Sequence, residues 1–410
     1  QQQAVVENRG GSLLVSAAAG SGKTRVLVER LLARVEGEGL DIDRFLVITY
    51  TKAAAAELRG KILDELHRRL ALRPGDRRLL RQTTRVYRAQ ISTIHSFCTA
   101  LLRECGHLLD LDPDFRVGDD GECAVLMGRA LDRVLEERYA AVTEGFANLL
   151  DTMSAGRDDS RLVDMVLDIY NRVQSHPRPE AWMVEQEEQL ALRGVSDVGD
   201  TPWGRLLLED AGRQAEYWRR ALVSILDDLD QDPVLEKAYS LSLCDTLDGL
   251  DDFLAGVGRG WNAARARAEI PFPRFAPARG VTHPALQERV KQVREACKKR
   301  MGRLAERFQL DSDALLADLA SVAPAVSELF GLVRGFSAAY AGEKARRRLV
   351  DFSDLEHLAL AALTDPEGRP TPLALRWGER YAEVMVDEYQ DTNEVQNAIF
   401  TALSREGRNL

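Results

Sequence analysis

The residues from Ser16 to Thr24, S-A-A-A-G-S-G-K-T, combine glycines, a lysine and a threonine at a spacing that suits phosphate binding. An apolar run from Leu13 to Val15 precedes them and a helical pattern begins at Val26, so we expect a strand, a glycine turn and a helix. Backbone N–H groups can converge on phosphate oxygens at such a turn because glycine has no Cβ, and the helix N-terminus favours the same anion. The alternative, a Gly/Ser turn beside a surface lysine, leaves the flanking elements unexplained.

The side chains of this loop predict a site for ATP and Mg²⁺. Lys23 is spaced to reach the β- and γ-phosphates, and the Thr24 hydroxyl is spaced to hold Mg²⁺. Ala17 stands where the common pattern G-x-x-x-x-G-K-[ST] has its first glycine. The backbone expected around the phosphates belongs to Ala19, Gly20, Ser21 and Gly22.

A second chemical signature lies near the end of the sequence. The apolar residues from Val384 to Val386 are followed by two carboxylates, Asp387 and Glu388, which is typical of a Walker B strand. Asp387 is expected to bind Mg²⁺, directly or through water, opposite Thr24, and Glu388 to orient and deprotonate the attacking water. A strand end capped by carboxylates is the alternative, but the phosphate loop in the same chain favours a single metal–triphosphate site.

Further strand–loop–helix units are expected to position these residues. The apolar run 45–49 precedes Tyr50, Thr51 and Lys52 and an alanine-rich helix, and the run 89–94 precedes His95 and another helix. Strands that alternate with helices indicate a parallel sheet. Because ligands bind at the carboxyl edge of such a sheet, the loops after these strands should share one rim.

The middle of the sequence has a different character. Between about residues 111 and 340 the apolar residues follow helical spacing without a convincing strand, which predicts a separate helical domain. The clearest helix is expected over residues 286–308, and its basic residues, such as Arg294, are expected to face water rather than nucleic acid.

The length and composition of the chain indicate which class of protein it belongs to. A chain of 410 residues predicts two folded units. No 18 apolar residues run uninterrupted and no signal peptide opens the sequence, so we expect a cytoplasmic protein without a membrane span. The five cysteines are scattered without a C-x-x-C pair and are expected to be reduced. The sequence starts without methionine, so we expect an excerpt of a longer chain.

The net charge of −10 argues against a chain coated in nucleic acid but allows a local basic groove. Basic residues cluster over 68–88 and over 344–348. Each cluster has two open interpretations, a nucleic-acid contact or a solvated helix face.

Six motifs, in order, resemble those of the superfamily 1A DNA helicases of the UvrD and RecB type. They are Gln1, A-A-G-S-G-K-T, T-Y-T-K-A-A-A-A-E-L-R, S-T-I-H-S-F-C, V-D-F-S-D-L and V-D-E-Y-Q-D-T-N. Within this family the likeness is strongest to AddA helicase/nuclease subunits of bacterial double-strand-break repair, which L-D-P-D-F-R and Q-S-H-P-R-P-E-A-W also resemble.

The resemblance implies a fold and an activity. Residues 1–110 and 341–410 would form a RecA-like P-loop domain, called 1A, whose parallel sheet has helices on both faces, and residues 111–340 an inserted all-helical domain, called 1B. ATP hydrolysis would drive 3′-to-5′ movement on single-stranded or double-stranded DNA, together with an AddB-like second subunit. The arginine fingers and any nuclease domain would lie beyond Leu410. A stand-alone UvrD-like repair helicase and a non-catalytic DNA-binding scaffold with a vestigial nucleotide site remain alternatives.

The resemblance also implies roles for single residues. Gln1 would read adenine, Gln390 would act with Lys23, Asp387 and Glu388 and link the ATP state to the DNA path, and Asp391 would brace the loop. Aromatic faces stack on bases, while hydroxyl, ammonium and imidazole groups meet phosphates. The residues expected along the single-stranded DNA path are Tyr50, Thr51, Lys52, Thr93, His95 and Phe352. An ordinary core position is the alternative for Phe352, and a hydrogen bond that only fixes its loop is the alternative for His95.

Overall fold

The computed structural model describes residues 2–18, 20–153, 160–404 and 407–410, so the predictions for Gln1 and Ala19 fall outside the described residues. The chain divides into two compact units. Unit 1 comprises Gln1–Thr143, Met153–Trp182 and Gly331–Leu410, and unit 2 comprises Glu144–Thr152 and Met183–Phe330. The domain limits at 110 and 340 that the family resemblance implies stay a prediction.

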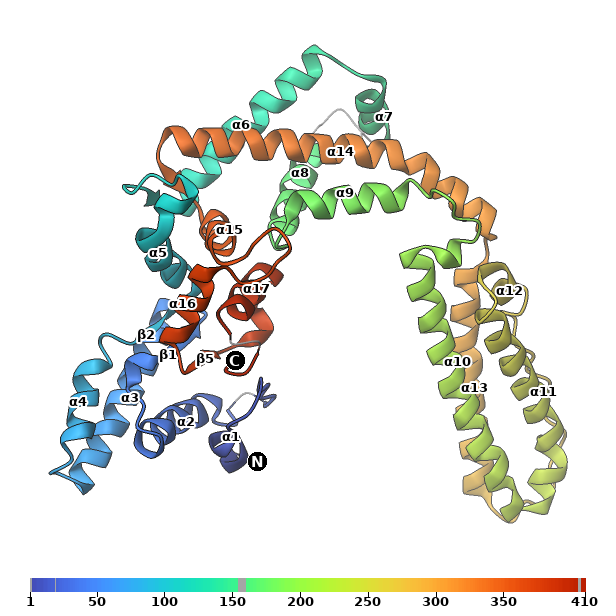
Figure 1. The fold of residues 1–410 in the computed structure, drawn as a ribbon. Helices are drawn as coiled ribbons and strands as arrows, with labels where there is room; N and C mark the ends of the chain where they lie inside the picture. Colours follow the sequence, from blue (N-terminus) through green and yellow to red (C-terminus); the bar gives the residue numbers. More distant parts are fainter. Residues whose placement is uncertain (1, 19, 154–159, 405–406) are drawn as a thin grey trace. The chain divides into compact units, whose positions relative to one another are not determined.

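Unit 1 contains a three-stranded parallel sheet in the order β2–β1–β5 (Figure 1). The strands are β1 (Phe45–Thr49), β2 (Gln90–Thr93) and β5 (Glu383–Val386). Thr49 pairs with Thr93 and Ile48 with Val386, so the carboxyl ends of all three strands lie at one edge. The predicted mixed α/β fold with a parallel sheet is confirmed.

The two faces of the sheet are covered by different helices. Side chains of β1 alternate, so Phe45 and Val47 pack on one cluster of buried residues while Leu46 and Ile48 pack on the other. The first cluster includes residues from α2 (Lys23–Gly37), α3 (Lys52–Leu72) and α4 (Arg77–Arg85). The second includes residues from α5 (Ile94–Cys105), α15 (Phe352–Leu363), α16 (Pro372–Arg380) and α17 (Glu394–Leu403). Burial on both faces explains why β1 is apolar from Phe45 to Ile48.

Two expectations about strands are wrong. Residues 13–15 do not form the strand predicted before the phosphate loop. Among the described residues a single backbone bond, from Leu13 N–H to Leu410 O at 3.0 Å, joins them to a neighbour, and Leu14 is 77% exposed. The range 111–340 is also not wholly helical, since β3 (Arg116–Val117) pairs in parallel with β4 (Leu349–Val350).

Unit 1 also contains an aromatic cluster and several further helices. Tyr170 meets Phe336 edge to face with ring centroids 4.9 Å apart, and Phe336 stacks on Tyr340 at 5.8 Å. The α-helices are α1 (Gln2–Glu7), α6 (Asp120–Ala140) and α8 (Ser160–Val173). The short 3₁₀ helices are η1 (Ile42–Arg44), η2 (Gly106–Leu109) and η6 (Tyr389–Asp391).

Unit 2 is helical, and α10 packs against both α11 and α13 (Figure 1). Its helices are α7 (Glu144–Met153), η3 (Val198–Asp200), α10 (Pro202–Asp228), η4 (Leu229–Gln231), α11 (Pro233–Val257), α12 (Trp261–Arg265), α13 (Pro284–Ala305) and η5 (Glu306–Phe308). The helix predicted over 286–308 is thus α13 with η5. Arg294 does not face water as expected, because it is buried with its guanidinium 4.5 Å from the centroid of the Phe275 ring.

Helices α9 (Pro179–Leu190) and α14 (Ser312–Arg346) include residues of both units. Within the described residues, α14 is the one helix whose length and apolar composition would allow it to cross a membrane. A single such helix is weak evidence for a membrane span, because core helices of other proteins meet the same criteria.

Candidate nucleotide and nucleic-acid site

The phosphate loop has the backbone that its glycines predict. Gly20 and Gly22 adopt φ angles of +75° and +86°, in the left-handed region that favours glycine. Ser21 N–H closes the turn on Ala18 O at 3.2 Å, and Gly22 is the N-cap of α2. In the described part of the chain no side chain caps α2, so its first N–H groups remain available to an anion.

The two predicted ATP motifs meet in space. The ammonium of Lys23 lies 3.8 Å from a carboxylate oxygen of Glu388 and 3.5 Å from the carbonyl oxygen of Ala17. Thr24 follows Lys23 in the first turn of α2. The loop and the end of β5 therefore form one polar site, as the pairing of the motifs in the sequence indicates.

The turn after β5 is held in a strained and specific shape. Asp387 N–H donates to Ile48 O at 2.9 Å, which fixes the turn to the neighbouring strand. Glu388 has a φ of +54° and a ψ of +46°, which is uncommon for a residue with a side chain and costs roughly 1–3 kcal/mol. The amide of Gln390 donates to the Glu388 carboxylate. Asp391 is exposed and its N–H donates to Glu388 O at 3.0 Å.

The charges around Asp387 suit a hard cation. Burial raises the pKa of Asp387, and the adjacent Glu388 carboxylate raises it further. A divalent cation would relieve this repulsion. Over the described residues, no three His, Cys, Asp or Glu side chains are grouped to hold a metal ion. Mg²⁺ usually takes only one or two protein ligands and completes its shell with water and phosphate oxygens, so Thr24 and Asp387 fit this ion.

A buried ion pair positions the two halves of this site. Glu383, at the start of β5, accepts hydrogen bonds from Arg30 Nε at 2.6 Å and Arg34 Nη1 at 2.7 Å, both on α2. Arg30 also donates to the carbonyl oxygens of Val5 and Asn8. The helix that begins at the phosphate loop is thus tied to the strand that ends at Asp387.

Predicted DNA contacts lie at the same edge of the sheet, but with unequal exposure. Tyr50 is 70% exposed, and Lys52 is exposed at the start of α3. Thr51 is the N-cap of α3 and accepts from Ala54 N–H. Thr93 is 7% exposed and caps α5, so its hydroxyl serves the helix. Its place along the DNA path stays a prediction.

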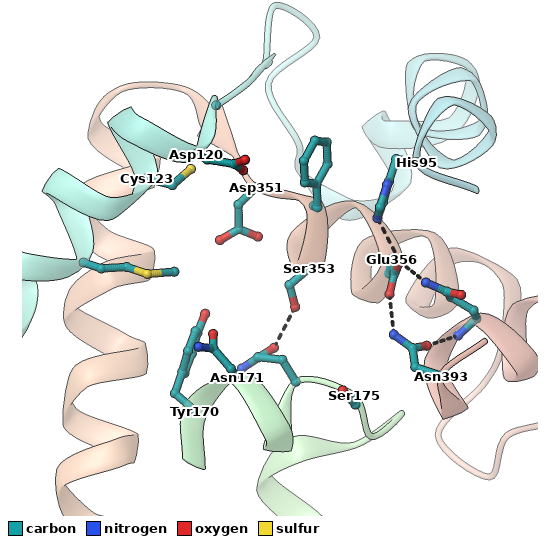
Figure 2. A pocket seen from close by; sticks show the side chains of 15 residues that line it. His95, Asp120, Cys123, Tyr170, Asn171, Ser175, Asp351, Ser353, Glu356 and Asn393 are labelled. Atoms are coloured by element: carbon teal, nitrogen blue, oxygen red, sulfur yellow. Dashed lines mark hydrogen bonds and ion pairs between the residues drawn. The ribbon is translucent and has the colours of Figure 1, made fainter. Parts of the chain in front are cut away.

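Phe352 and His95 form a stacked pair with ring centroids 4.4 Å apart and an angle of 27° between the rings. Phe352 is 45% exposed, which excludes the alternative of an ordinary core position. His95 does bind a neighbour, since its Nε2 lies 3.0 Å from Oε1 of Glu356, and it also presents a ring to Phe352. The pair belongs to the wall of a pocket of about 360 Å³, which Asp351, Ser353 and residues of α6 and α8 also line (Figure 2).

The residues that sequence reasoning missed surround this pair. Glu356 accepts hydrogen bonds from Asn393 and Gln396, and Ser353 donates to the Gln174 side chain (Figure 2). Glu356 could have been noticed as a carboxylate within the apolar pattern of 355–363, four residues after Phe352. Of its partners, His95 was predicted from the sequence and Asn393 ends the motif V-D-E-Y-Q-D-T-N, but no pattern pairs either of them, or Gln396, with Glu356.

The basic cluster over 68–88 is largely neutralised by carboxylates. Arg69, for example, contacts Glu29, Glu36 and Glu65, and the Arg85 guanidinium lies 2.8 Å from Asp43. Its arginines therefore brace α2, α3 and α4.

Comparisons with known proteins agree with this geometry. The family described as the UvrD/REP helicase N-terminal domain matches residues 1–410. An ATP-dependent helicase/nuclease subunit from Pelotomaculum thermopropionicum is 38% identical over 417 residues, which cover 99% of this chain and 33% of the relative. Proteins with the same description from Heliobacterium modesticaldum and Geobacillus kaustophilus are 38% and 36% identical and are covered to 31% and 33% of their length.

The chain thus spans about a third of the length of these relatives. The family match extends over every motif of the site, from the phosphate loop to the turn after β5. The chain belongs to the UvrD/REP helicase N-terminal domain family.

Proposed function

We propose that these residues are the N-terminal motor part of an ATP-dependent 3′-to-5′ DNA helicase and translocase of the AddA type. The observation that carries the proposal is the 3.8 Å approach of the Lys23 ammonium to the Glu388 carboxylate, because it joins the phosphate loop and the Walker B turn in one site. Exposed Tyr50 follows β1, and exposed Phe352 stacks on His95, which follows β2, so both support a nucleic-acid surface near the carboxyl ends of these strands.

Each residue of the site has a separate role in ATP hydrolysis. Bound Mg·ATP supplies the reactive phosphoanhydride and the charge of the cation. The N–H groups at the start of α2 and the Lys23 ammonium hold phosphate oxygens, while Thr24 and Asp387 hold the cation. Glu388 orients and deprotonates water, and the Gln390 amide, which donates to that carboxylate, holds it in place.

The wider assignment follows from the family and the relatives. Unit 1 supports a RecA-like domain 1A, and the helices of unit 2 support a helical insertion of the 1B type. We further propose action in double-strand-break repair in the cytoplasm, an AddB-like partner protein, and a nuclease domain and arginine fingers outside these 410 residues. A UvrD-like repair helicase without a nuclease is the other enzyme that the family match allows.

ATP hydrolysis by the natural full-length protein, with and without single-stranded DNA, tests the proposal. Lys23→Ala should abolish the DNA-stimulated rate, since it removes the cation that meets the phosphates. Lys237→Ala, an exposed lysine of unit 2, is the matched control and should behave as wild type. Hydrolysis that survives in folded Lys23→Ala protein would contradict the assignment of the phosphate loop. A wild-type rate that does not rise with DNA would contradict the assignment of DNA as the substrate.

A further inference from the structure

The Glu356 carboxylate is buried, and no lysine or arginine that the structure describes forms an ion pair with it. It is 5% exposed and contacts His95 Nε2 at 3.0 Å, Asn393 Nδ2 at 3.1 Å and Gln396 Nε2 at 2.7 Å (Figure 2). Burial acts to raise the pKa of Glu356, but the hydrogen bonds from these three side chains outweigh burial and lower it. An ionised carboxylate is costly to bury unless it is hydrogen-bonded, so Glu356 depends on these three side chains and ties together the segments that carry them.

One side of Glu356 holds the surface proposed for DNA. Phe352 and Glu356 are four residues apart on α15 and so share a face of the helix. The Phe352 ring stacks on His95, and the Glu356 carboxylate binds the same imidazole. A base that stacks on the exposed face of Phe352 would therefore shift the His95 ring and, through it, the Glu356 carboxylate.

The other side of Glu356 holds the turn that carries Glu388. Asn393 is the N-cap of α17, where its Oδ1 accepts from Gln396 N–H at 2.8 Å while its Nδ2 donates to Glu356. Glu388 and Asn393 are separated by η6 and its C-cap Thr392, whose N–H donates to Tyr389 O at 3.1 Å. A shift of Asn393 is thus carried by one tight turn to Glu388, whose backbone is already strained.

We propose that Glu356 is a positioning residue through which DNA seated on Phe352 and His95 sets the placement of the Glu388 carboxylate. The inference rests on the proposed function, since it takes DNA at one end of this contact chain and ATP hydrolysis at the other. Glu356 acts through His95 and Asn393, and its role is to raise hydrolysis when DNA is present.

The test compares Glu356→Gln with Glu394→Gln in the natural full-length protein. Glutamine keeps the volume but turns an N–H group toward three donors, so it breaks at least one contact. Glu394 follows Asn393 and is exposed, and it hydrogen bonds to His176 rather than to Glu356, which makes it a matched control. The readouts are the ATPase rate with saturating single-stranded DNA, the rate without DNA, and the DNA dissociation constant.

We expect Glu356→Gln to lower the ratio of DNA-stimulated to basal rate on the order of tenfold. The basal rate and the DNA dissociation constant should stay within about threefold, a split that a general loss of structure would not produce. Glu394→Gln should match wild type. An unchanged ratio in folded Glu356→Gln protein overturns the inference.

A double-mutant cycle with Phe352→Ala tests whether the two residues lie on one route. The double variant should lose as much of the DNA stimulation of the ATPase rate as Glu356→Gln alone. If the two single-variant losses multiply in the double variant, the inference is overturned. If Glu356→Gln does not fold, Gln396→Met removes one of the three donors and must still lower the ratio by at least about threefold. Absence of stimulation in wild type would defeat the proposed function itself, whereas stimulation that is equal in all variants defeats only the role of Glu356.

Discussion

Removal of the Glu383 carboxylate should loosen the contact between the phosphate-loop helix and the Walker B strand. The side chains of Glu383, Arg30 and Arg34 are only 8%, 11% and 16% exposed, and Glu383 accepts short hydrogen bonds from both arginines. Glu383→Ala leaves two buried guanidinium groups without this acceptor. Breaking a buried ion pair by removing one partner costs about 3–5 kcal/mol.

Hydrogen exchange of the strand amides can measure this cost locally. The Asp387 N–H, which bonds to Ile48 O across the sheet, reports on opening between β5 and β1. A loss of about 3–5 kcal/mol corresponds to exchange that is roughly 10²- to 10⁴-fold faster, at about 1.4 kcal/mol per tenfold. Glu383→Gln, which keeps one acceptor oxygen, should lie between wild type and Glu383→Ala.

Glu379→Ala is the control for this experiment, because Glu379 is an exposed carboxylate on α16 close to Glu383 in sequence. Surface substitutions of this kind usually change stability by less than about 0.5 kcal/mol. A loss below about 1 kcal/mol in Glu383→Ala, or an equal loss in Glu379→Ala, would refute the claim that the ion pair braces the site.

Three further changes probe other parts of the structure. Gly22→Ala should cost roughly 1–2 kcal/mol, because Gly22 has a φ of +86°, and should weaken nucleotide binding measured with a fluorescent ATP analogue; unchanged binding would contradict the role of the turn. Glu388→Gln should keep Mg·ATP binding but stop hydrolysis in single-turnover assays, so an equal loss of both would show that the glutamate is not the base. Hydrogen bonds from Arg68 and Arg69 lower the pKa of Glu65 from 4.5 to about 2. The stability that Glu65 adds, relative to Glu65→Gln, should therefore be full above about pH 5 and fall as the pH drops toward 2. Thermal unfolding of both proteins measures this difference, and a difference that grows on acidification would contradict the expected sign.

Local patterns in the sequence predicted what depends on neighbouring residues. Gly20 and Gly22 needed only the loop pattern to be placed in a turn before a helix, and the apolar run of β1 needed only burial on both faces of a sheet. The approach of Lys23 to Glu388 followed from the two motifs, which together complete a single metal–triphosphate site. These predictions need only local patterns, which a single sequence contains.

Features that depend on distant partners could not be predicted in the same way. Leu13 to Val15 have strand-like composition, but a strand requires several backbone bonds to a neighbour, and the described residues supply one, from Leu13 to Leu410. Arg294 lies over the Phe275 ring, and Glu356 collects donors from α5 and α17. No spacing rule brings such residues together.

Movement along single-stranded DNA tests the central claim most directly. The assay measures ATP-dependent displacement of streptavidin from biotin at either end of an oligonucleotide by the natural full-length protein. A motor that moves 3′ to 5′ should displace streptavidin from the 5′ end, and Lys23→Ala should abolish this displacement, while Lys237→Ala keeps it. Displacement only from the 3′ end, or displacement that persists in folded Lys23→Ala protein, would contradict the account.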